Sequence, residues 1–193
     1  MKVSIIENEA LQTHQIAWLE QIDGYARRQP EEAEAVGLFS LFMRQRADAA
    51  QRELVQGHLT GSAWLVSADG ERVLLTHHRK LGLWLQLGGH ADGDSDIARV
   101  ALREAEEESG LSDLALRAEV FDIDRHWIPE HGEVAGHWHY DMRYVVRCCG
   151  SEQFVISEES LALAWRNIAE IAQDGSADAS VRRMAHKWLR SNQ

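Results

Sequence analysis

The chain has 193 residues, 45% of them hydrophobic, and a formal net charge of −11 at pH 7, which suits one domain with a core and an appendage. It has no run of eighteen apolar residues and no apolar signal core after Met1, so we expect a cytoplasmic protein with no membrane partner. The acidic balance also disfavours binding to a nucleic acid polymer.

Residues 1–56 are predicted to form a helical extension without a catalytic signature. A first helix is expected over residues 9–22 and should end at Gly24. Pro30 is typical of a first helical turn, and a second helix is expected to continue from there toward Leu54. The apolar stripes of both helices indicate packing rather than chemistry.

Strands are predicted from residue 58 onward. The sequence Asp69-Gly70 indicates a hairpin turn between strands at 58–67 and 72–77. Cys148 and Cys149 should point to opposite faces of a later strand, which argues against a disulfide framework and a zinc motif. The other expected elements are strands at 84–87, 114–124, 137–149 and 161–166, a short edge at 154–156, and helices at about 96–109 and 178–190.

The helix expected at 96–109 carries a cluster of acids. Glu104, Glu107 and Glu108 are spaced to share one face, because residues three and four apart are neighbours on a helix. A divalent cation such as Mg²⁺ would hold these carboxylates together, since hard metals take oxygen ligands. Ser95 or Asp94 can cap the start of this helix, and Gly110 suits its C-terminal end.

Together with the preceding glycines, the acids resemble the Nudix box, the signature of metal-dependent hydrolases that cleave nucleoside diphosphates linked to another group. The positions in register are Gly89, Arg103, Glu104, Glu107, Glu108, Gly110 and Leu111. One position departs, because Ser95 stands where the motif has a loop glutamate. Asp94 or Asp96 is a candidate replacement, and the departure puts the loop geometry in question more than the metal chemistry.

A wider resemblance links the chain to a bacterial subgroup of Nudix hydrolases with no assigned substrate. It extends from His77 through Gly88-Gly89-His90 to Trp165. It implies an α/β fold, the Nudix α/β/α sandwich with a mixed sheet, after an N-terminal helical extension. The expected division is an extension of residues 1–56 and a hydrolase domain of residues 57–193. A homodimer is compatible with the resemblance, because enzymes of this family are often dimers.

The strand expected at 137–149 has one polar face. Alternation puts His137, His139, Asp141 and Arg143 on it. Such a face suggests the wall of a wet pocket, in which Arg143 binds a phosphate and a histidine moves protons or holds a metal. The competing interpretation is an ordinary solvated strand face.

Further candidates for substrate binding surround the glycine pair. His90 follows it directly, and Arg79 precedes the strand that leads into it; each could instead be structural or solvated. His126 and His131 lie in a loop that could approach the same pocket, but the histidine spacings match no standard zinc motif.

The resemblance implies hydrolysis of a diphosphate linkage in a small phosphorylated substrate, a nucleotide derivative. Glu104, Glu107 and Glu108 would hold Mg²⁺ or Mn²⁺, which lowers the pKa of an attacking water. The candidate catalytic residues are Glu104 and Glu159, as alternative general bases, and Arg103, which orients the carboxylates.

Two rival functions are compatible with parts of the sequence. The altered loop and the extension would also suit a non-catalytic Nudix domain that senses a nucleotide, although the three metal acids are retained. An isomerase of isoprenoid diphosphates shares the fold but needs a cysteine near the box, and the chain has cysteines at positions 148 and 149 alone.

Overall fold

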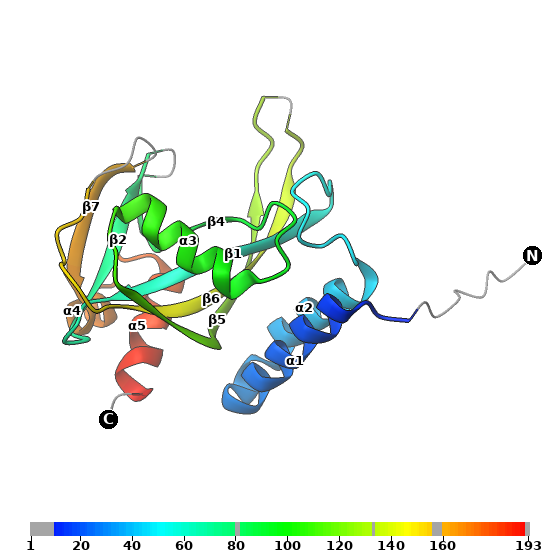
Figure 1. Cartoon of the computed structure of the whole chain (residues 1–193), viewed down its shortest axis with the longest axis horizontal. Coiled ribbons are helices and arrows are strands. Elements are labelled where there is room, and N and C mark those ends of the chain that lie inside the picture. Colours follow the sequence, from blue (N-terminus) through cyan, green and yellow to red (C-terminus); the bar gives the residue numbers. More distant parts are fainter. Residues whose placement is uncertain (1–9, 80–81, 133, 156–159, 192–193) are drawn as a thin grey trace, which may run out of the picture.

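The computed structural model describes residues 10–79, 82–132, 134–155 and 160–191, and it has a mixed sheet with helices on both faces (Figure 1). This architecture confirms the expected α/β fold with helices ahead of the sheet. Among the described residues, no helix combines the length and apolar character needed to cross a bilayer. The elements are α1 (Thr13–Arg28), η1 (Pro30–Glu32), α2 (Ala33–Gln45), β1 (Gly57–Val66), β2 (Arg72–His78), β3 (Trp84–Leu85), β4 (Leu87–His90), α3 (Ile97–Ser109), β5 (Leu114–Ile128), β6 (His137–Cys148), β7 (Ser160–Asn167), α4 (Ile168–Gln173) and α5 (Ala179–Ser191).

The central strand of the sheet is β1, which is buried along its whole length. The strand order is β3-β2-β1-β6-β5, and in addition β4 pairs with β1 and β7 with β2. The β1–β6 pair is parallel, whereas the other pairs are antiparallel. The parallel register places three residues of β1 beside three of β6: His58 beside His139, Thr60 beside Asp141, and Ser62 beside Arg143. Because side chains alternate along strands, these polar residues share one face of the sheet.

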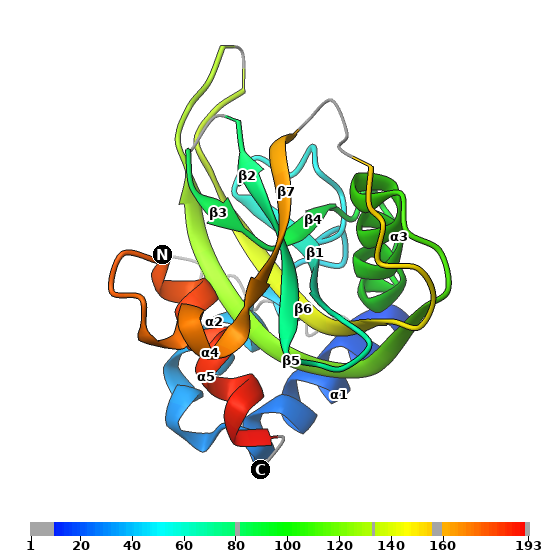
Figure 2. The same ribbon diagram turned by 90° about the vertical axis from the view of Figure 1, so that its left-hand side faces the viewer.

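Helix α3 covers the opposite face. A side-chain carbon at Gly61 in β1 would lie 2.8 Å from the Ile97 carbonyl oxygen, so a glycine is needed for this close approach. The antiparallel pair α1–α2 packs on the same face as α3, where Phe42 stacks on Tyr140 of β6. Helices α4 and α5 pack on the polar face (Figure 2). They contact Trp64 and Val66, which lie toward the end of β1.

The N-terminal helices differ from their expected bounds. Helix α1 continues through Gly24 to Arg28, because a glycine inside a helix costs only about 1 kcal/mol and the next residue, Tyr25, is fully buried. Helix α2 ends at Gln45 and does not continue toward Leu54. The chain turns after it, and Ala49 accepts a hydrogen bond from the backbone of Leu59, which fixes the entry into β1.

Other bounds lie close to those expected, with four differences. Strand β5 continues to Ile128, and the strand expected at 84–87 is divided into β3 and β4. The short helix α4 was not predicted. Phe154 and Val155 belong to no strand, and Ile156, the third residue of the expected edge, lies outside the described residues. Cys148 is buried and Cys149 exposed, as alternation requires. The division at residues 56 and 57 remains a prediction.

Candidate active site

Helix α3 carries three carboxylates beside the face that packs on β1. Val100, Ala101 and Ala105 are buried against the strands. Glu104 and Glu108 are half-buried, whereas Glu107 is exposed. Glu106 is also exposed, as expected for an acid that faces away from the cluster.

The carboxylates contact the glycine pair of β4. Gly88 donates its backbone N–H to Glu108 Oε1 over 2.7 Å. A side-chain carbon at Gly89 would lie 2.5 Å from Glu104 Oε2, closer than real contacts allow. The glycines therefore leave space for the carboxylates rather than provide an unusual backbone angle, since neither has a positive φ.

Arg103 links helix α3 to the residue after the glycines. Its Nη2 donates to Glu104 Oε1 over 3.0 Å and to the backbone oxygen of His90 over 3.2 Å. The hydrogen bond to Glu104 raises the pKa of Arg103, so the guanidinium stays charged. These contacts suit a residue that positions the carboxylate and the β4 backbone.

The loop between β4 and α3 is organised by two aspartates. Asp94 pairs with Arg99 over 2.7 Å and accepts from the backbone N–H of Asp96. Asp96, rather than the expected Ser95 or Asp94, caps α3, because its carboxylate accepts from the backbone N–H of Arg99. Ser95 instead offers its backbone oxygen to Trp18 Nε1 of α1 at 2.8 Å, which ties the extension to this loop. At the other end, Gly110 ends α3 in the left-handed region with φ 67°, as predicted.

Four histidines meet on the polar face of the sheet, close to the glycine pair. One ligand nitrogen from each of His58, His90, His137 and His139 lies within 4.8 Å of the others. Burial and the neighbouring His90 lower the pKa of His58 to about 4 and that of His139 to about 2, so both rings are neutral at neutral pH. His58 was not predicted as a site residue, because its proximity to the other histidines depends on the parallel pairing of β1 and β6.

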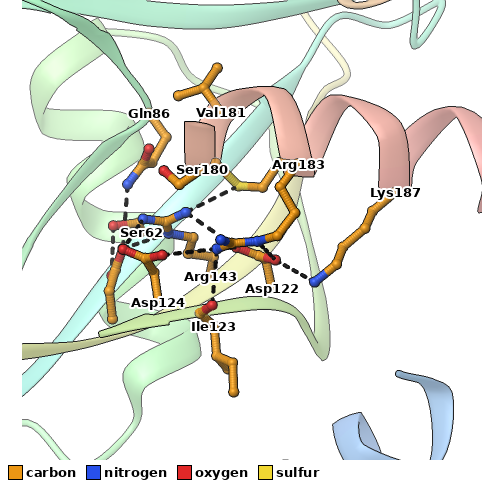
Figure 3. A network of polar contacts seen from close by, with 12 residues as sticks. Ser62, Gln86, Asp122, Ile123, Asp124, Arg143, Ser180, Val181, Arg183 and Lys187 are labelled. Atoms are coloured by element: carbon orange, nitrogen blue, oxygen red, sulfur yellow. Dashed lines mark hydrogen bonds and ion pairs between the residues drawn. The ribbon is translucent and has the colours of Figure 1, made fainter. Parts of the chain in front are cut away.

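Arg143, further along β6 on the same face, lies in a buried network of polar contacts (Figure 3). It is 2% exposed, its Nε donates to Asp141 over 2.7 Å, and its Nη1 donates to Asp122 over 3.2 Å. Its Nη2 lies 3.3 Å from Asp124. A guanidinium held by three carboxylates suits a role in stabilising the fold better than the expected role as a phosphate ligand.

The Asp122 carboxylate of the network stays ionised. Burial alone would raise the pKa of Asp122, but the hydrogen bond from Arg183 and the charges of Arg143 and Lys187 outweigh it and lower the pKa. Asp141 accepts from the hydroxyl groups of Thr60 and Ser62 over 3.0 and 2.8 Å. The polar face predicted for β6 is thus occupied by an ordered internal network, not by a solvated surface.

The remaining candidates lie around this centre. Arg79 is exposed at the end of β2. His126 lies in strand β5 and not in the expected loop, its ring contacts Asp124 at 3.1 Å, and its ring centroid is 5.3 Å from that of His139. His131 lies at the tip of the β5–β6 hairpin, paired with Val134. Glu159, the candidate base outside the helix, lies outside the described residues, as does Glu158.

The donor set on α3 fits the divalent cation that the motif implies. Glu104, Glu107 and Glu108 offer only oxygen atoms, the ligands that Mg²⁺ and Mn²⁺ prefer. The missing side chain at Gly89 leaves room for the Glu104 carboxylate itself. The donor chemistry of the three acids therefore suits a hard cation, although among the described residues their oxygen atoms do not converge as the histidine nitrogens do.

Comparison with known proteins gives a family match. The model of the NUDIX domain matches residues 58–187 of the chain, which include β1, the glycine pair, α3 and most of α5. No curated protein sequence matches the chain significantly.

Solved structures show the same fold at low sequence identity. A NUDIX family hydrolase from Clostridium perfringens has a TM-score of 0.55 and 23% identity, and the match covers 70% of this chain and 98% of that one. The MutT protein from Methanosarcina mazei Go1 has a TM-score of 0.56 and 17% identity, with coverages of 72% and 98%. The dihydroneopterin triphosphate pyrophosphohydrolase of E. coli has a TM-score of 0.55 and 18% identity, with coverages of 69% and 95%.

Proposed function

The chain belongs to the NUDIX domain family, and from this premise we propose that it is a divalent-metal-dependent pyrophosphohydrolase. Its substrate would be a nucleoside diphosphate derivative or a similar small phosphorylated molecule, cleaved at a diphosphate linkage. The observation that carries the proposal is the carboxylate face of Glu104, Glu107 and Glu108 beside Gly88 and Gly89.

The proposed mechanism assigns a task to each residue of this face. Glu104, Glu107 and Glu108 would hold Mg²⁺ or Mn²⁺. When bound, the cation neutralises phosphate charge and lowers the pKa of the attacking water. Arg103 positions Glu104 and the β4 backbone through its hydrogen bonds to Glu104 and to the His90 oxygen.

The chemical step is attack of water on one phosphorus atom. A new P–O bond forms, the bond from that phosphorus to the bridging oxygen breaks, and the second phosphate leaves with that oxygen. A glutamate takes the proton of the water, and both Glu104 and Glu159 remain candidates for this base. Proton transfer of this kind typically contributes 10²–10⁴-fold in rate, that is about 3–5 kcal/mol of the barrier.

Metal-dependent hydrolysis by the purified full chain tests the proposal. The panel contains ADP-ribose, nucleoside triphosphates, dinucleoside polyphosphates and coenzyme A, each with Mg²⁺ or Mn²⁺, and products are identified by mass spectrometry. We expect Glu107→Gln to lower kcat by about 100-fold or more. Loss of a residue that hydrogen-bonds a metal ligand typically costs about 10- to 100-fold, and loss of the ligand itself should cost more. Glu106→Gln removes the same charge from the exposed side of the same helix and should keep full activity.

Two outcomes count against this function. Absence of product from the whole panel with either cation would contradict it. Tight nucleotide binding without turnover, unchanged in Glu107→Gln, would favour the alternative of a non-catalytic nucleotide sensor. If hydrolysis is found, Glu159→Gln separates the two bases, because retained activity leaves Glu104 as the candidate.

A further inference from the structure

The four-histidine group joins three neighbouring strands. His58 comes from β1, His90 from β4, and His137 and His139 from β6. His58 lies beside His139 in the parallel register, and His90 lies opposite Thr60, two residues further along β1. Within the described part of the chain, this is the one group of three or more potential ligands that converges in this way.

His58 is buried, with 2% of the residue exposed. Within the described ranges neither of its ring nitrogens makes a hydrogen bond of good geometry, although the Leu54 backbone lies near enough to raise its pKa slightly against the larger lowering by burial. Its ring centroid lies 4.8 to 5.0 Å from those of the other three histidines. A buried polar group without a hydrogen bond destabilises the fold by about 1–3 kcal/mol. A buried imidazole surrounded by three other imidazoles therefore suggests that a ligand binds between them.

His137 and His139 already have the orientation of metal ligands. His137 Nδ1 lies 2.9 Å from the Ala135 oxygen, a contact in which the nitrogen must donate, and this leaves a lone pair on Nε2. That Nε2 is 3.2 Å from His139 Nε2. A tetrahedral ion with bonds of about 2.0–2.1 Å separates two ligand nitrogens by roughly 3.4 Å. The backbone contact of His137 is the kind that fixes the ring of a metal-binding histidine.

His90 contacts Arg52, and this contact must be given up if Nδ1 is to bind an ion. Its Nδ1 lies 3.3 Å from Arg52 Nη2. Arg52 has a half-exposed side chain and a second partner, Asp92, at 3.4 Å. The contact between Arg52 and His90 is an exposed hydrogen bond, and such bonds contribute about 1 kcal/mol net, so its loss costs little.

We propose that His58, His90, His137 and His139 bind a transition-metal ion of the Zn²⁺ class at a site separate from the carboxylates of α3. An all-imidazole set suits Zn²⁺, Cu²⁺ or Ni²⁺, whereas Mg²⁺ prefers oxygen ligands. Four protein ligands without an open position are typical of a structural zinc site. The ion links β4 to β1 and β6 through His90, whose backbone oxygen also accepts a hydrogen bond from Arg103. It therefore stabilises β4, the strand that the carboxylates of α3 contact.

Zinc binding by the full chain, without substrate, tests this site independently of the hydrolase proposal. The chelator-treated protein is titrated with ZnCl₂ in excess MgCl₂, which competes for the carboxylate site, and bound zinc is measured by mass spectrometry. We expect one Zn²⁺ per chain and a rise in Tm of about 5–10 °C at 100-fold excess over Kd. Co²⁺ in place of Zn²⁺ should give the intense visible absorption of a tetrahedral complex.

Variants separate this site from other metal-binding positions. His139→Gln and the half-buried His90→Gln should each weaken Zn²⁺ binding by about 100-fold or more, and His90→Gln serves if His139→Gln does not fold. His126→Gln, a histidine on the same face with Asp124 as its partner, should bind Zn²⁺ like the wild type. The proposal is overturned if the wild type binds no stoichiometric Zn²⁺, or if binding survives His90→Gln and is lost in Glu107→Gln.

Discussion

Gly89 and Glu104 depend on each other at the scale of single residues. The carboxylate occupies the volume that a side chain at position 89 would fill, since a carbon there would lie 2.5 Å from Glu104 Oε2. The motif glycine is thus explained by the room it leaves for the acid and not by backbone strain. The sequence predicted that these two residues are close, but it did not indicate this physical reason.

Gly89→Ala should lower activity more than stability. The clash involves the end of a flexible side chain, which can move, so the free energy of unfolding should change by less than about 1 kcal/mol. The displaced Glu104 would lose its alignment, and kcat should fall about 10- to 100-fold. Urea unfolding and the metal-dependent assay measure the two effects.

A second glycine provides the matched control. Gly37 lies exposed in α2, and a side-chain carbon there would meet nothing within 4 Å. Gly37→Ala should therefore stabilise the protein by about 0.5–1 kcal/mol and leave kcat unchanged. Equal activity in the two variants would contradict the role given to Gly89.

Among the elements, local signals predicted more than long-range pairing did. The periodicity of residues 97–109 and the left-handed Gly110 determine α3 within a residue or two. Helix α2 ends before the predicted position because Ala49 and Ala50 are buried in the core. This is an effect of tertiary packing, which local helix signals in the sequence do not indicate. The parallel pairing of β1 with β6 was likewise not evident, so the face shared by His137, His139 and Asp141 was predicted whereas the contribution of His58 was missed.

The start of α3 offers a test at the element scale. Asp96→Ala removes the carboxylate that accepts from the Arg99 N–H, and it should lower the free energy of unfolding by about 1 kcal/mol. Asp96→Asn keeps a capping oxygen and should lower the free energy of unfolding by only a few tenths of a kcal/mol. Urea unfolding of both variants measures the difference, and equal losses would show that the cap does not stabilise α3.

The whole molecule is held together by a buried polar network that reaches from the sheet to the extension. Lys187 of α5 is 4% exposed and donates to Asp122 of β5, to the Tyr25 hydroxyl of α1, and pairs with Glu32 of η1. Figure 3 shows Lys187 extending from α5 toward Asp122. The Lys187 ammonium group thus joins the N-terminal helices, β5 and α5, which are distant in sequence. No local sequence pattern could predict this contact.

Lys187→Met should destabilise the whole fold. The substitution removes the cation that pairs with Asp122 and Glu32 in the protein interior. Removal of one partner of a buried ion pair typically lowers the free energy of unfolding by about 3–5 kcal/mol. Arg190→Met removes a charge from an exposed position of the same helix and should change the free energy of unfolding by less than about 0.5 kcal/mol. Urea unfolding at pH 7 measures both values.

The loss caused by Lys187→Met should also depend on pH. The pKa of Asp122 is lowered in the folded protein, because Arg183, Arg143 and Lys187 together outweigh its burial. A carboxylate of this kind adds stability that is present above its unfolded pKa of about 3.9 and is lost as the pH falls through the folded value. The difference between wild type and Lys187→Met should therefore be constant from pH 7 to about pH 5 and narrow below about pH 4. A difference that stays constant down to pH 2 would mean that Lys187 stabilises the fold by packing and not by its charge.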